Sequence, residues 1–379
     1  MSVDAGASAS TDDDERWMAQ ALALAERGRG LCSPNPMVGA VVVNAGRVVG
    51  QGFHARAGTA HAEVEALTNA GDLARGATLY VTLEPCNHHG RTPPCVDAIR
   101  AAGIRRVVAA VTDPNPRVEG GGAQALRSTG IDVRVGCLAE QARACNRVFM
   151  LAMERRRPHV MLKCAMTLDG KIAAFDRSAR WISGEASRTE AHQLRSESDA
   201  VIVGIGTVLA DDPALTVRLD PPWPREPWRV VVDSRARLPL DARLIDAGDP
   251  SRALVAVADE APPERVAALE ARGVTVLACK SRAGHVDPAD LCARLFALDV
   301  MGVLLEGGSR LNWAFVEGGL VDRVAIFIAP ILVGGTSAPT AVGGHGFPLP
   351  EALRLRSVTA RSLGPDWLLE GDVVPRSGA

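Results

Sequence analysis

Two cysteines and two histidines lie close together in the segment LEPCNHHGRTPPC, which runs from Leu83 to Cys95. Thiolates and imidazoles are common zinc ligands, and paired thiols can also form a disulfide. The segment therefore fits three kinds of site: a disulfide loop, a closed structural zinc site built from Cys86, His88, His89 and Cys95, or an open catalytic zinc site that takes one ligand from elsewhere in the chain. Only the open site would make the protein an enzyme.

A further candidate ligand precedes this segment in His61-Ala62-Glu63, at the start of a helix that we predict over residues 61–71. One imidazole and two thiolates give zinc three protein ligands and leave a fourth position for water. Zinc lowers the pKa of bound water from 15.7 to about 7. Glu63 is near the ligand in sequence and would carry the proton of that water to a substrate ring nitrogen and then to a leaving amine.

The order H-x-E followed by P-C-x-x-C is typical of zinc-dependent deaminases. This chain contains HAE and PC, but eight residues instead of two separate Cys86 from Cys95. A longer loop can still return the second thiolate to the ion, and the two prolines before Cys95 stiffen the entry into the next helix. We therefore favour the open site, which leaves His88 and His89 for the loop or the substrate. The disulfide is least favoured, because we expect a reducing cytoplasm.

The chain is long enough for two domains, because 379 residues exceed what one hydrophobic core usually serves. A net charge of -2 and an aromatic content of 4% argue against a surface built to follow a nucleic acid. The polar, acidic first residues do not resemble a signal peptide, and no apolar run reaches the roughly 18 residues of a membrane span. We expect a cytoplasmic protein without a nucleic-acid or membrane partner.

Helix and strand signals alternate through the first half of the chain, which predicts a layered α/β domain. A helix over residues 14–28 has one apolar face, formed by Trp17, Met18, Ala21, Leu22 and Ala25. Strands over 37–43 and 47–54 would form a hairpin with a three-residue loop, Asn44-Ala45-Gly46. The other elements predicted in this half are a helix from about His61, strand 77–83, a helix after Pro94, strand 105–111, a helix near Ala123 and strand 131–135.

A basic turn, MERRRPH, separates this half from a second α/β series, and we interpret its arginines as complementing the dipole at a helix C-terminus. The predicted strands of the second half cover residues 159–165, 199–204, 228–233, 253–257, 274–278 and 302–308. The predicted organisation is a disordered tail over 1–14, a first domain over 15–153 and a second domain over 154–379.

Nine segments of the sequence resemble, in order, the bifunctional riboflavin biosynthesis deaminase-reductase family. Its deaminase half is similar to SPNPMVGAVVV, GFHARAGTAHAEVEAL, VTLEPCNHHGRTPPC and TDPNPRV, and its reductase half to LKCAMTLDGK, WISG, VGIGTVLADDPALTVR, VVDSR and LLEGGSRLNWAF. The resemblance extends from about Glu15 to Leu369. It implies an α/β protein of two domains, an N-terminal cytidine-deaminase-like α/β/α zinc domain and a C-terminal dihydrofolate-reductase-like α/β domain.

The resemblance also implies two reactions. In the first, a zinc-dependent hydrolysis would convert 2,5-diamino-6-(5-phosphoribosylamino)pyrimidin-4-one to 5-amino-6-(5-phosphoribosylamino)uracil and release ammonia. In the second, NADPH would deliver a hydride to the ribosyl C1 and give 5-amino-6-(5-phosphoribitylamino)uracil. The expected partners are these phosphoribosyl pyrimidines, one Zn2+ per chain, NADPH and further copies of the chain in a homo-oligomer.

For the deaminase half, the resemblance implies that His61, Cys86 and Cys95 hold zinc and that Glu63 transfers protons. It implies substrate contacts for five further residues, namely Asn35, His54, Arg91, Asp113 and Asn115. Four of these contacts have an alternative: the two asparagines would form turns beside prolines, and His54 and Arg91 would be exposed loop residues.

For the reductase half, the resemblance implies cofactor contacts for Ala165, Trp181, Thr207, Asp211, Ser234, Gly308, Ser309, Arg310, Leu311, Asn312, Trp313 and Ala314. It implies substrate contacts for Ala179, Arg195, Leu215, Arg218 and Glu306. Ala179 stands where the family often has a hydroxyl group, so its contact would be weaker or made by the backbone.

Physical chemistry supports part of this assignment. Gly307-Gly308 lies at the end of a predicted strand and would let backbone amides approach a phosphate. Gly204-Ile205-Gly206 lacks the third glycine of a dinucleotide-binding motif, so we interpret it as a turn at the end of a strand. Arg195 and Arg218 suit a substrate phosphate or, alternatively, the surface, and Trp181 suits a cofactor or the core. Lys163 and Asp169 would order the site, with no catalytic step, because hydride transfer depends mainly on positioning the nicotinamide.

Two other functions compete with this assignment. A nucleic-acid base deaminase with an unrelated C-terminal domain would need an electropositive track and stacking aromatic residues. A non-catalytic zinc module would need a coordinatively closed ion and would have no use for Glu63.

Overall fold

The computed structural model describes residues 11–88, 93–115, 121–179 and 181–376, and it divides into two compact units. Unit 1 is Met1–Arg155 and unit 2 is Arg156–Ala379. The boundary falls two residues after the predicted one at 153/154, because the last helix of unit 1, α6 (Arg147–Arg155), continues to Arg155. As predicted for the basic turn, arginine ends this helix.

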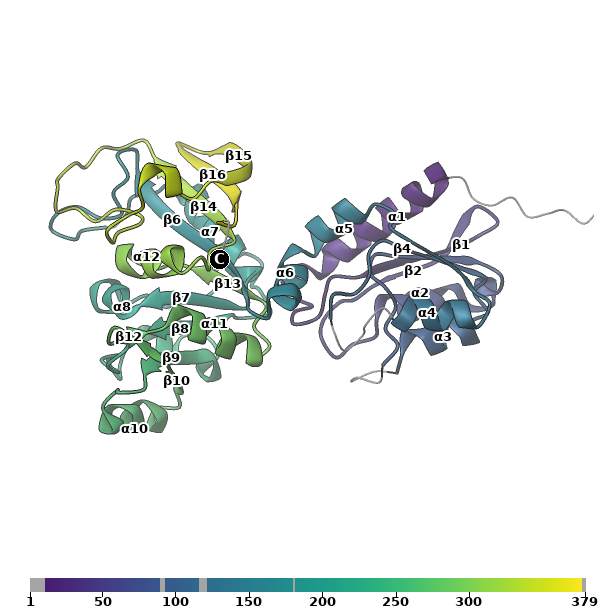
Figure 1. The fold of residues 1–379 in the computed structure, drawn as a ribbon, viewed down its shortest axis with the longest axis horizontal. Helices are drawn as coiled ribbons and strands as arrows, with labels where there is room; N and C mark the ends of the chain where they lie inside the picture. Colours follow the sequence, from purple (N-terminus) through teal and green to yellow (C-terminus); the bar gives the residue numbers. More distant parts are fainter. Residues whose placement is uncertain (1–10, 89–92, 116–120, 180, 377–379) are drawn as a thin grey trace, which may run out of the picture. The chain divides into compact units, whose positions relative to one another are not determined.

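Unit 1 is a three-layer α/β/α structure around a five-stranded sheet (Figure 1). The sheet has the order β2-β1-β3-β4-β5, in which β1 is antiparallel to β2 and β3, and β3, β4 and β5 are parallel. Helices α1 and α5 lie on one face, and α2, α3 and α4 lie on the other (Figure 1). The elements are α1 (Thr11–Ala25), β1 (Gly39–Asn44), β2 (Arg47–Phe53), α2 (Ala62–Ala70), β3 (Thr78–Val81), α3 (Cys95–Ala101), β4 (Arg106–Ala109), α4 (Gly121–Ser128), β5 (Asp132–Val135), α5 (Ala139–Cys145) and α6.

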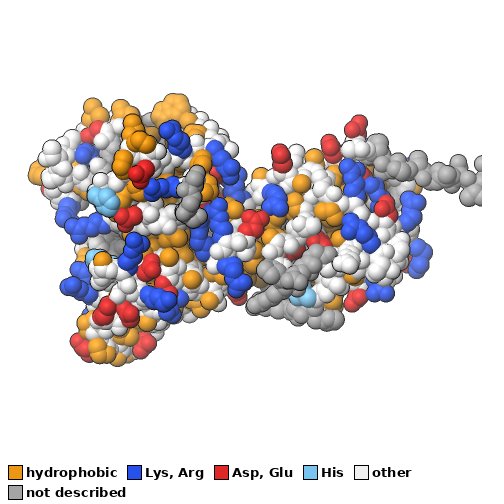
Figure 2. All heavy atoms as spheres, in the orientation of Figure 1, with side chains coloured by type: hydrophobic (Ala, Val, Ile, Leu, Met, Phe, Trp, Pro, Cys, Tyr) orange, Lys and Arg blue, Asp and Glu red, His pale blue; other side chains and the backbone are white. Residues whose placement is uncertain are grey.

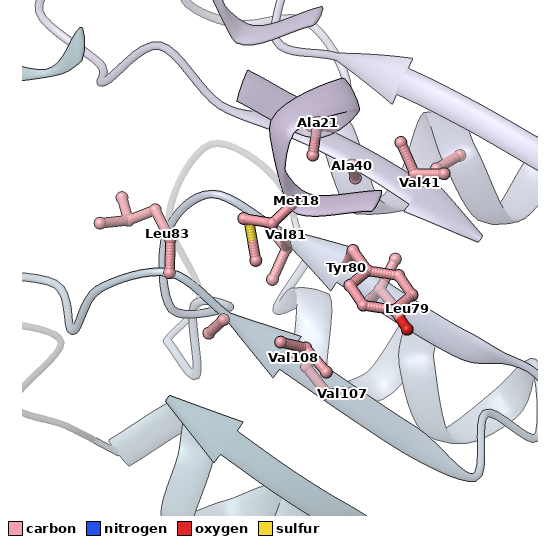
Figure 3. Close-up of a cluster of buried hydrophobic side chains, with 14 of the residues drawn as sticks. Met18, Ala21, Ala40, Val41, Leu79, Tyr80, Val81, Leu83, Val107 and Val108 are labelled. Carbon is pink, nitrogen blue, oxygen red and sulfur yellow. The ribbon is translucent and has the colours of Figure 1, made fainter. Parts of the chain in front are cut away.

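The predicted apolar face of α1 packs against the sheet (Figure 3). Met18 and Ala21 are completely buried, and Figure 3 shows them over Ala40 and Val81 of the sheet. Gly39 allows this close approach, because a Cβ atom there would lie 2.0 Å from the backbone oxygen of Ala21. The helical periodicity therefore predicted the buried face correctly.

The start of α1 corrects the predicted tail. Thr11 to Asp14 are helical, and Asp14 is completely buried, whereas residues 1–10 lie outside the described part of the chain. The Asp14 carboxylate accepts hydrogen bonds from Arg106, Arg134 and the Tyr80 hydroxyl. A polar, acidic composition suggested disorder, but it could not reveal these partners in β3, β4 and β5.

The hairpin of β1 and β2 has a two-residue turn instead of the predicted three-residue loop. Asn44 pairs with Arg47, which leaves only Ala45 and Gly46 in the turn. Both have positive φ, 47° and 72°, as a type I′ turn requires. The twist of that turn matches the twist of the strands, so Asn44 remains in the ladder.

Unit 2 is built on a nine-stranded sheet with the order β10-β9-β8-β7-β13-β6-β14-β16-β15. From β10 through β14 in this spatial order, neighbouring strands are parallel. Strands β16 and β15 then add an antiparallel edge. The strands are β6 (His159–Thr167), β7 (Ala200–Gly204), β8 (Trp228–Val232), β9 (Ala253–Ala258), β10 (Thr275–Cys279), β13 (Gly302–Leu305), β14 (Arg323–Ala329), β15 (Leu355–Leu363) and β16 (Asp366–Val373). The first six match the predicted strands, whereas β14, β15 and β16 were not predicted.

Two apolar cores cover the two faces of this sheet. Alternate residues of β7 enter different cores, Ala200 and Ile202 the first and Val201 and Val203 the second. The helices of unit 2 are α7 (Glu185–Ser196), α8 (Ile205–Asp211), α9 (Arg243–Asp246), α10 (Pro263–Ala271), α11 (Pro288–Ala297) and α12 (Ser309–Glu317), and a small hairpin is formed by β11 (Ser281–Arg282) and β12 (His285–Val286).

The distribution of surface charge and the character of the helices agree with the near-neutral composition and the lack of long apolar runs in the sequence. On the face shown in Figure 2, acidic and basic side chains are interspersed over both units. Within the described residues, none of the helices combines the length and the apolar character needed to cross a bilayer.

Candidate active sites

The fold of unit 1 brings together three predicted metal ligands from three segments. His61 caps the N-terminus of α2, Cys86 lies in the loop after β3, and Cys95 begins α3. The His61 Nδ1 atom lies 3.1 Å from Cys95 Sγ and 3.6 Å from Cys86 Sγ. The three ligand atoms all lie within 4.8 Å of one another.

This donor set fits zinc. Around a tetrahedral zinc ion, a nitrogen and a sulfur ligand are about 3.6 Å apart and two sulfurs about 3.8 Å apart, as follows from the usual bond lengths. The separation of His61 Nδ1 from Cys86 Sγ, 3.6 Å, has the nitrogen–sulfur value, and that from Cys95 Sγ, 3.1 Å, is shorter. Three ligands leave the fourth position open. All eight cysteines are free thiols, so the disulfide interpretation is wrong. In the described part of the chain, His88 is exposed and outside the ligand group; His89 is not described.

Only one of the two thiols, Cys86, loses its proton readily. Hydrogen bonds from Cys95 and His61 lower the pKa of Cys86 to about 4, despite its burial. The hydrogen bond to the Cys86 sulfur, together with burial, raises the pKa of Cys95. The pair is therefore a thiolate and a thiol in the absence of a cation, and a divalent ion would displace the remaining proton.

Glu63 lies beside these ligands in the first turn of α2, with only 4% of its surface exposed. Burial raises the pKa of this carboxyl group to about 6, and a hydrogen bond with Cys95 opposes the rise. A general acid or base works best when its pKa is near the working pH. Glu63 therefore has the position and the chemistry of a proton carrier.

Asn35 and His54 form a hydrogen-bonded pair next to the ligands. The His54 ring lies edge-on to the His61 ring, with centroids 5.4 Å apart. Because the Ala60 oxygen 3.1 Å away can only accept, His54 Nδ1 carries the hydrogen, and Nε2 accepts from the Asn35 amide at 3.0 Å. Burial lowers the pKa of His54, which is only 3% exposed, so the exposed-loop alternative is wrong.

Asp113 and Asn115 lie in the loop after β4, where the Asp113 carboxylate accepts from the Asn115 backbone at 2.8 Å. Burial, with the nearby Glu84 and Cys86, raises the pKa of Asp113 to about 6. Glu84 was not predicted: its buried carboxylate accepts from the backbone nitrogens of Asp113, at 3.3 Å, and Ala123, at 2.9 Å. A glutamate directly after an apolar strand was the available signal. Arg91 lies outside the described residues.

In unit 2, a group of charged side chains surrounds Glu306, which follows β13. Arg195 donates to its two oxygens at 2.6 and 3.0 Å, and Lys163 Nζ lies 3.4 Å away. Burial raises the pKa of Glu306, but the charges of Arg195 and Lys163 offset this and hold it well below its usual range. The Arg195 side chain is only 12% exposed, so it is not a surface arginine.

The other predicted substrate residues of unit 2 differ from one another in exposure and in backbone conformation. Arg218 is exposed, and it contacts both ring nitrogens of His192, a residue that was not predicted. Leu215 is buried and has a left-handed backbone, with φ 56°. Ala179 is half-buried.

Several predicted cofactor residues meet at the carboxyl ends of β7 and β13. A Cβ atom at Gly308 would lie 3.7 Å from Thr207 Oγ1, and one at Gly204 would lie 3.7 Å from Leu311. Gly204 ends β7 and caps α8, so the predicted strand-end turn is confirmed. Ligands of parallel α/β sheets usually bind at such an edge.

Other predicted cofactor residues make contacts within the protein. Asn312 is completely buried and donates to the Ala341 oxygen at 2.8 Å, and Trp313 packs against His345 and Phe347. Ser234 Oγ accepts from the Val286 backbone at 3.0 Å. Trp181 is 69% exposed under the Arg188 guanidinium, so the core alternative for Trp181 is wrong. Of the rest, Ala165 lies on β6, Asp211 ends α8, and Ser309, Arg310 and Ala314 lie on α12.

Comparison with known proteins assigns both units. The family model for the cytidine and deoxycytidylate deaminase zinc-binding region matches residues 11–111, and the model for the RibD C-terminal domain matches residues 158–369. The riboflavin biosynthesis protein RibD of Actinobacillus pleuropneumoniae is 42% identical over 96% of this chain and 96% of its own length. That of Escherichia coli (strain K12) is 40% identical over 94% of this chain and 98% of its own. The chain belongs to the RibD family.

Solved structures of RibD proteins have the same two-unit fold. A RibD structure from Acinetobacter baumannii has a TM-score of 0.87 at 38% identity and covers 97% of this chain and 100% of its own. A deaminase/reductase structure from Thermotoga maritima has a TM-score of 0.82 at 36% identity and covers 96% of this chain and 99% of its own.

Family membership makes the protein a bifunctional deaminase and reductase of riboflavin biosynthesis. Its cofactors are zinc in the deaminase unit, where His61, Cys86 and Cys95 meet, and NADPH in the reductase unit. The second unit excludes a nucleic-acid deaminase with an unrelated C-terminal domain, and the matched enzymatic domains exclude a non-catalytic zinc module.

Proposed function

We propose that unit 1 deaminates 2,5-diamino-6-(5-phosphoribosylamino)pyrimidin-4-one and that unit 2 then reduces the ribosyl group of 5-amino-6-(5-phosphoribosylamino)uracil. The Thermotoga maritima relative is described as a diaminohydroxyphosphoribosylaminopyrimidine deaminase and 5-amino-6-(5-phosphoribosylamino)uracil reductase. The observation that carries the proposal is the convergence of His61, Cys86 and Cys95 beside the buried Glu63.

In the deamination, His61, Cys86 and Cys95 would hold the zinc ion. When bound, zinc lowers the pKa of a water molecule to about 7 and so supplies a nucleophile at neutral pH. Glu63 would take one proton from the attacking water, because its raised pKa allows it to hold a proton near neutrality. It would give this proton to the pyrimidine ring nitrogen, then take the second proton from the new hydroxyl group on carbon and give it to the leaving amine, which departs as ammonia while the carbonyl forms.

The substrate of the first reaction would be held by residues around the ligands. The His54 ring is fixed by the hydrogen bond that Nδ1 donates to the Ala60 oxygen, and its Nε2 accepts from the Asn35 amide and so orients it. Glu84 fixes the Asp113–Asn115 loop through the Asp113 backbone. We assign the substrate contacts to Asn35, His54, Arg91, Asp113 and Asn115.

In the reduction, bound NADPH would supply the hydride that goes to the ribosyl C1. The residues of unit 2 would hold the two reactants close together and correctly oriented, which is the main requirement of hydride transfer. Glu306 orients Arg195 through two hydrogen bonds, and Arg195 and Arg218 would bind the substrate phosphate. Substrate contacts are assigned to these three residues with Ala179 and Leu215, and cofactor contacts to Ala165, Trp181, Thr207, Asp211, Ser234 and the run from Gly308 to Ala314.

We also propose that the protein acts in the cytoplasm as a homo-oligomer. Its edge strand β15 is exposed along most of its length, and Val358 and Trp367 of β15 and β16 are 51% and 54% exposed. An exposed edge strand offers unpaired backbone groups to another chain. The mass of the zinc-loaded protein in solution tests this assembly.

The proposed function is tested with Glu63→Ala and the isosteric Glu63→Gln. Both variants would keep one zinc per chain, because Glu63 is not a ligand, and both would lose ammonia release by about 100-fold or more. Both would still oxidise NADPH when they are given the deaminated intermediate. Zinc content, ammonia release and absorbance of NADPH are measured on the same preparations.

Two outcomes would sink the assignment. Undiminished ammonia release from Glu63→Gln would show that Glu63 does not carry the proton. Failure of the wild-type protein to oxidise NADPH with the deaminated intermediate would show that unit 2 does not catalyse the proposed reduction.

A further inference from the structure

His192 links two arginines of the reductase site, although no sequence pattern singled it out. It lies three residues before Arg195 on α7, so the two side chains lie on the same side of the helix. Arg218 Nε lies 3.2 Å from His192 Nε2, and the Arg218 backbone nitrogen lies 3.3 Å from His192 Nδ1. The imidazole therefore contacts both the backbone and the guanidinium of Arg218.

This contact has more donors than acceptors. Arg218 brings two N–H groups, and a neutral imidazole has one N–H of its own and only one nitrogen that can accept. Within the described residues, Arg218 forms an ion pair with none of the carboxylates. An anionic ligand would supply the acceptors that this group lacks.

Arg195 and Arg218 differ in the charge of the group that orients them. Arg195 is held by Glu306, whose carboxylate neutralises it and also contacts Lys163. Arg218 is held by an imidazole, and burial together with the charges of Arg195 and Arg218 lowers the pKa of His192 to about 4. At neutral pH the ring is therefore uncharged. A neutral acceptor orients Arg218 without cancelling its positive charge.

The atoms that remain on Arg218 suit a phosphate. Its Nε is directed to His192, so the Nη1 and Nη2 amino groups stay available for a bidentate contact with two phosphate oxygens. A flexible, exposed arginine loses side-chain entropy when it binds, and an arginine that is already oriented loses less. The benefit of His192 would thus appear in substrate affinity.

We propose that His192 is a positioning residue of the reductase unit, which holds the Arg218 guanidinium ready for the phosphate of the ribosyl substrate while leaving its charge intact. This inference rests on the proposed function. It concerns a residue that acts through Arg218 and does not itself touch the reacting atoms.

The test uses the full-length, zinc-loaded protein, with His192→Ala, His192→Gln, Arg218→Ala and the double variant of His192→Ala with Arg218→Ala. NADPH oxidation is measured with the deaminated intermediate and with the same compound lacking its phosphate. His192→Ala would raise KM for the phosphorylated compound about tenfold, as expected for loss of one hydrogen bond to a charged group, with a smaller change in kcat. His192→Gln would restore KM, because a glutamine oxygen can accept from Arg218.

The double variant distinguishes positioning from a general structural effect. If His192 acts through Arg218, the double variant has the same KM as Arg218→Ala alone. None of the changes would alter KM for the compound without phosphate. Equal losses on both compounds, additive effects in the double variant, or an unchanged KM in His192→Ala would each overturn the inference. A wild-type protein that oxidises NADPH with neither compound would overturn the proposed function and this inference with it.

Discussion

His61, Cys86 and Cys95 are held in place by the backbone around them as well as by their own side chains. The Cys95 backbone nitrogen donates to Cys86 Sγ at 3.4 Å, and the Val96 nitrogen donates to the Cys86 oxygen at 3.3 Å. Backbone N–H groups near a sulfur favour the thiolate, which is the form that binds a metal. The start of α3 thus binds the long cysteine loop and brings its second thiolate back to the first.

This geometry predicts different effects for two nearby histidines. His61→Ala would lose most of its zinc and its ammonia release, because two thiolates alone hold the ion poorly. His88→Ala, a change in the cysteine loop itself, would keep one zinc per chain, because His88 is outside the ligand group. Metal analysis of the two purified variants tests this directly. Zinc loss in His88→Ala would favour the closed site instead.

At the scale of elements, α1 is fixed to the sheet by apolar packing along its length and by Asp14 at its start. Asp14 is completely buried, and it joins the helix to Arg106 of β4 and Arg134 of β5. Removing one partner of a buried ion pair leaves the other charge uncompensated. The ion pairs therefore matter for the orientation of α1 on the sheet.

Asp14→Ala would lower the free energy of unfolding of unit 1 by about 3 kcal/mol. The matched control is Asp12→Ala in the same helical turn, where an exposed carboxylate interacts mainly with the helix dipole and its loss costs less than about 1 kcal/mol. Urea unfolding of both variants gives the comparison. Equal destabilisation by the two changes would contradict the role of Asp14.

At the scale of the whole molecule, each proposed site lies within one unit. The zinc ligands and Glu63 belong to unit 1, and Glu306 and its cations belong to unit 2. Each unit also has apolar cores of its own. The two reactions therefore depend on two different compact units.

Each ligand should therefore stabilise only the unit that binds it. Removal of zinc with a chelator would lower the unfolding temperature of unit 1 only. Addition of NADPH at 100 times its Kd would stabilise unit 2 only, by about 2.7 kcal/mol. Calorimetry of the full chain, with each treatment applied separately, resolves the two effects. A single transition that moves with both treatments would show that the units unfold together.

Much of the fold could be predicted from local patterns. The apolar face of α1 and the buried strands β6 to β9 were correct, because periodicity and long apolar runs reflect burial directly. Strand β15 was missed because its residues are nearly all exposed, so that no apolar alternation marks them. The turn at Ala45 was misjudged because strand pairing, and not composition, determines where Asn44 belongs.

The sequence by itself determined the chemical groups of the first site: HAE and the loop from Cys86 to Cys95 supply an imidazole, a carboxylate and two thiolates suited to zinc. The tertiary structure places Cys95, which the sequence already favoured over His88, in the ligand group, and it alone decided that Asp14 and His192 have arginine partners. The physical reason is distance along the chain. Periodicity records which face of an element is buried, whereas the partner of a polar side chain depends on how elements far apart in sequence pack against one another.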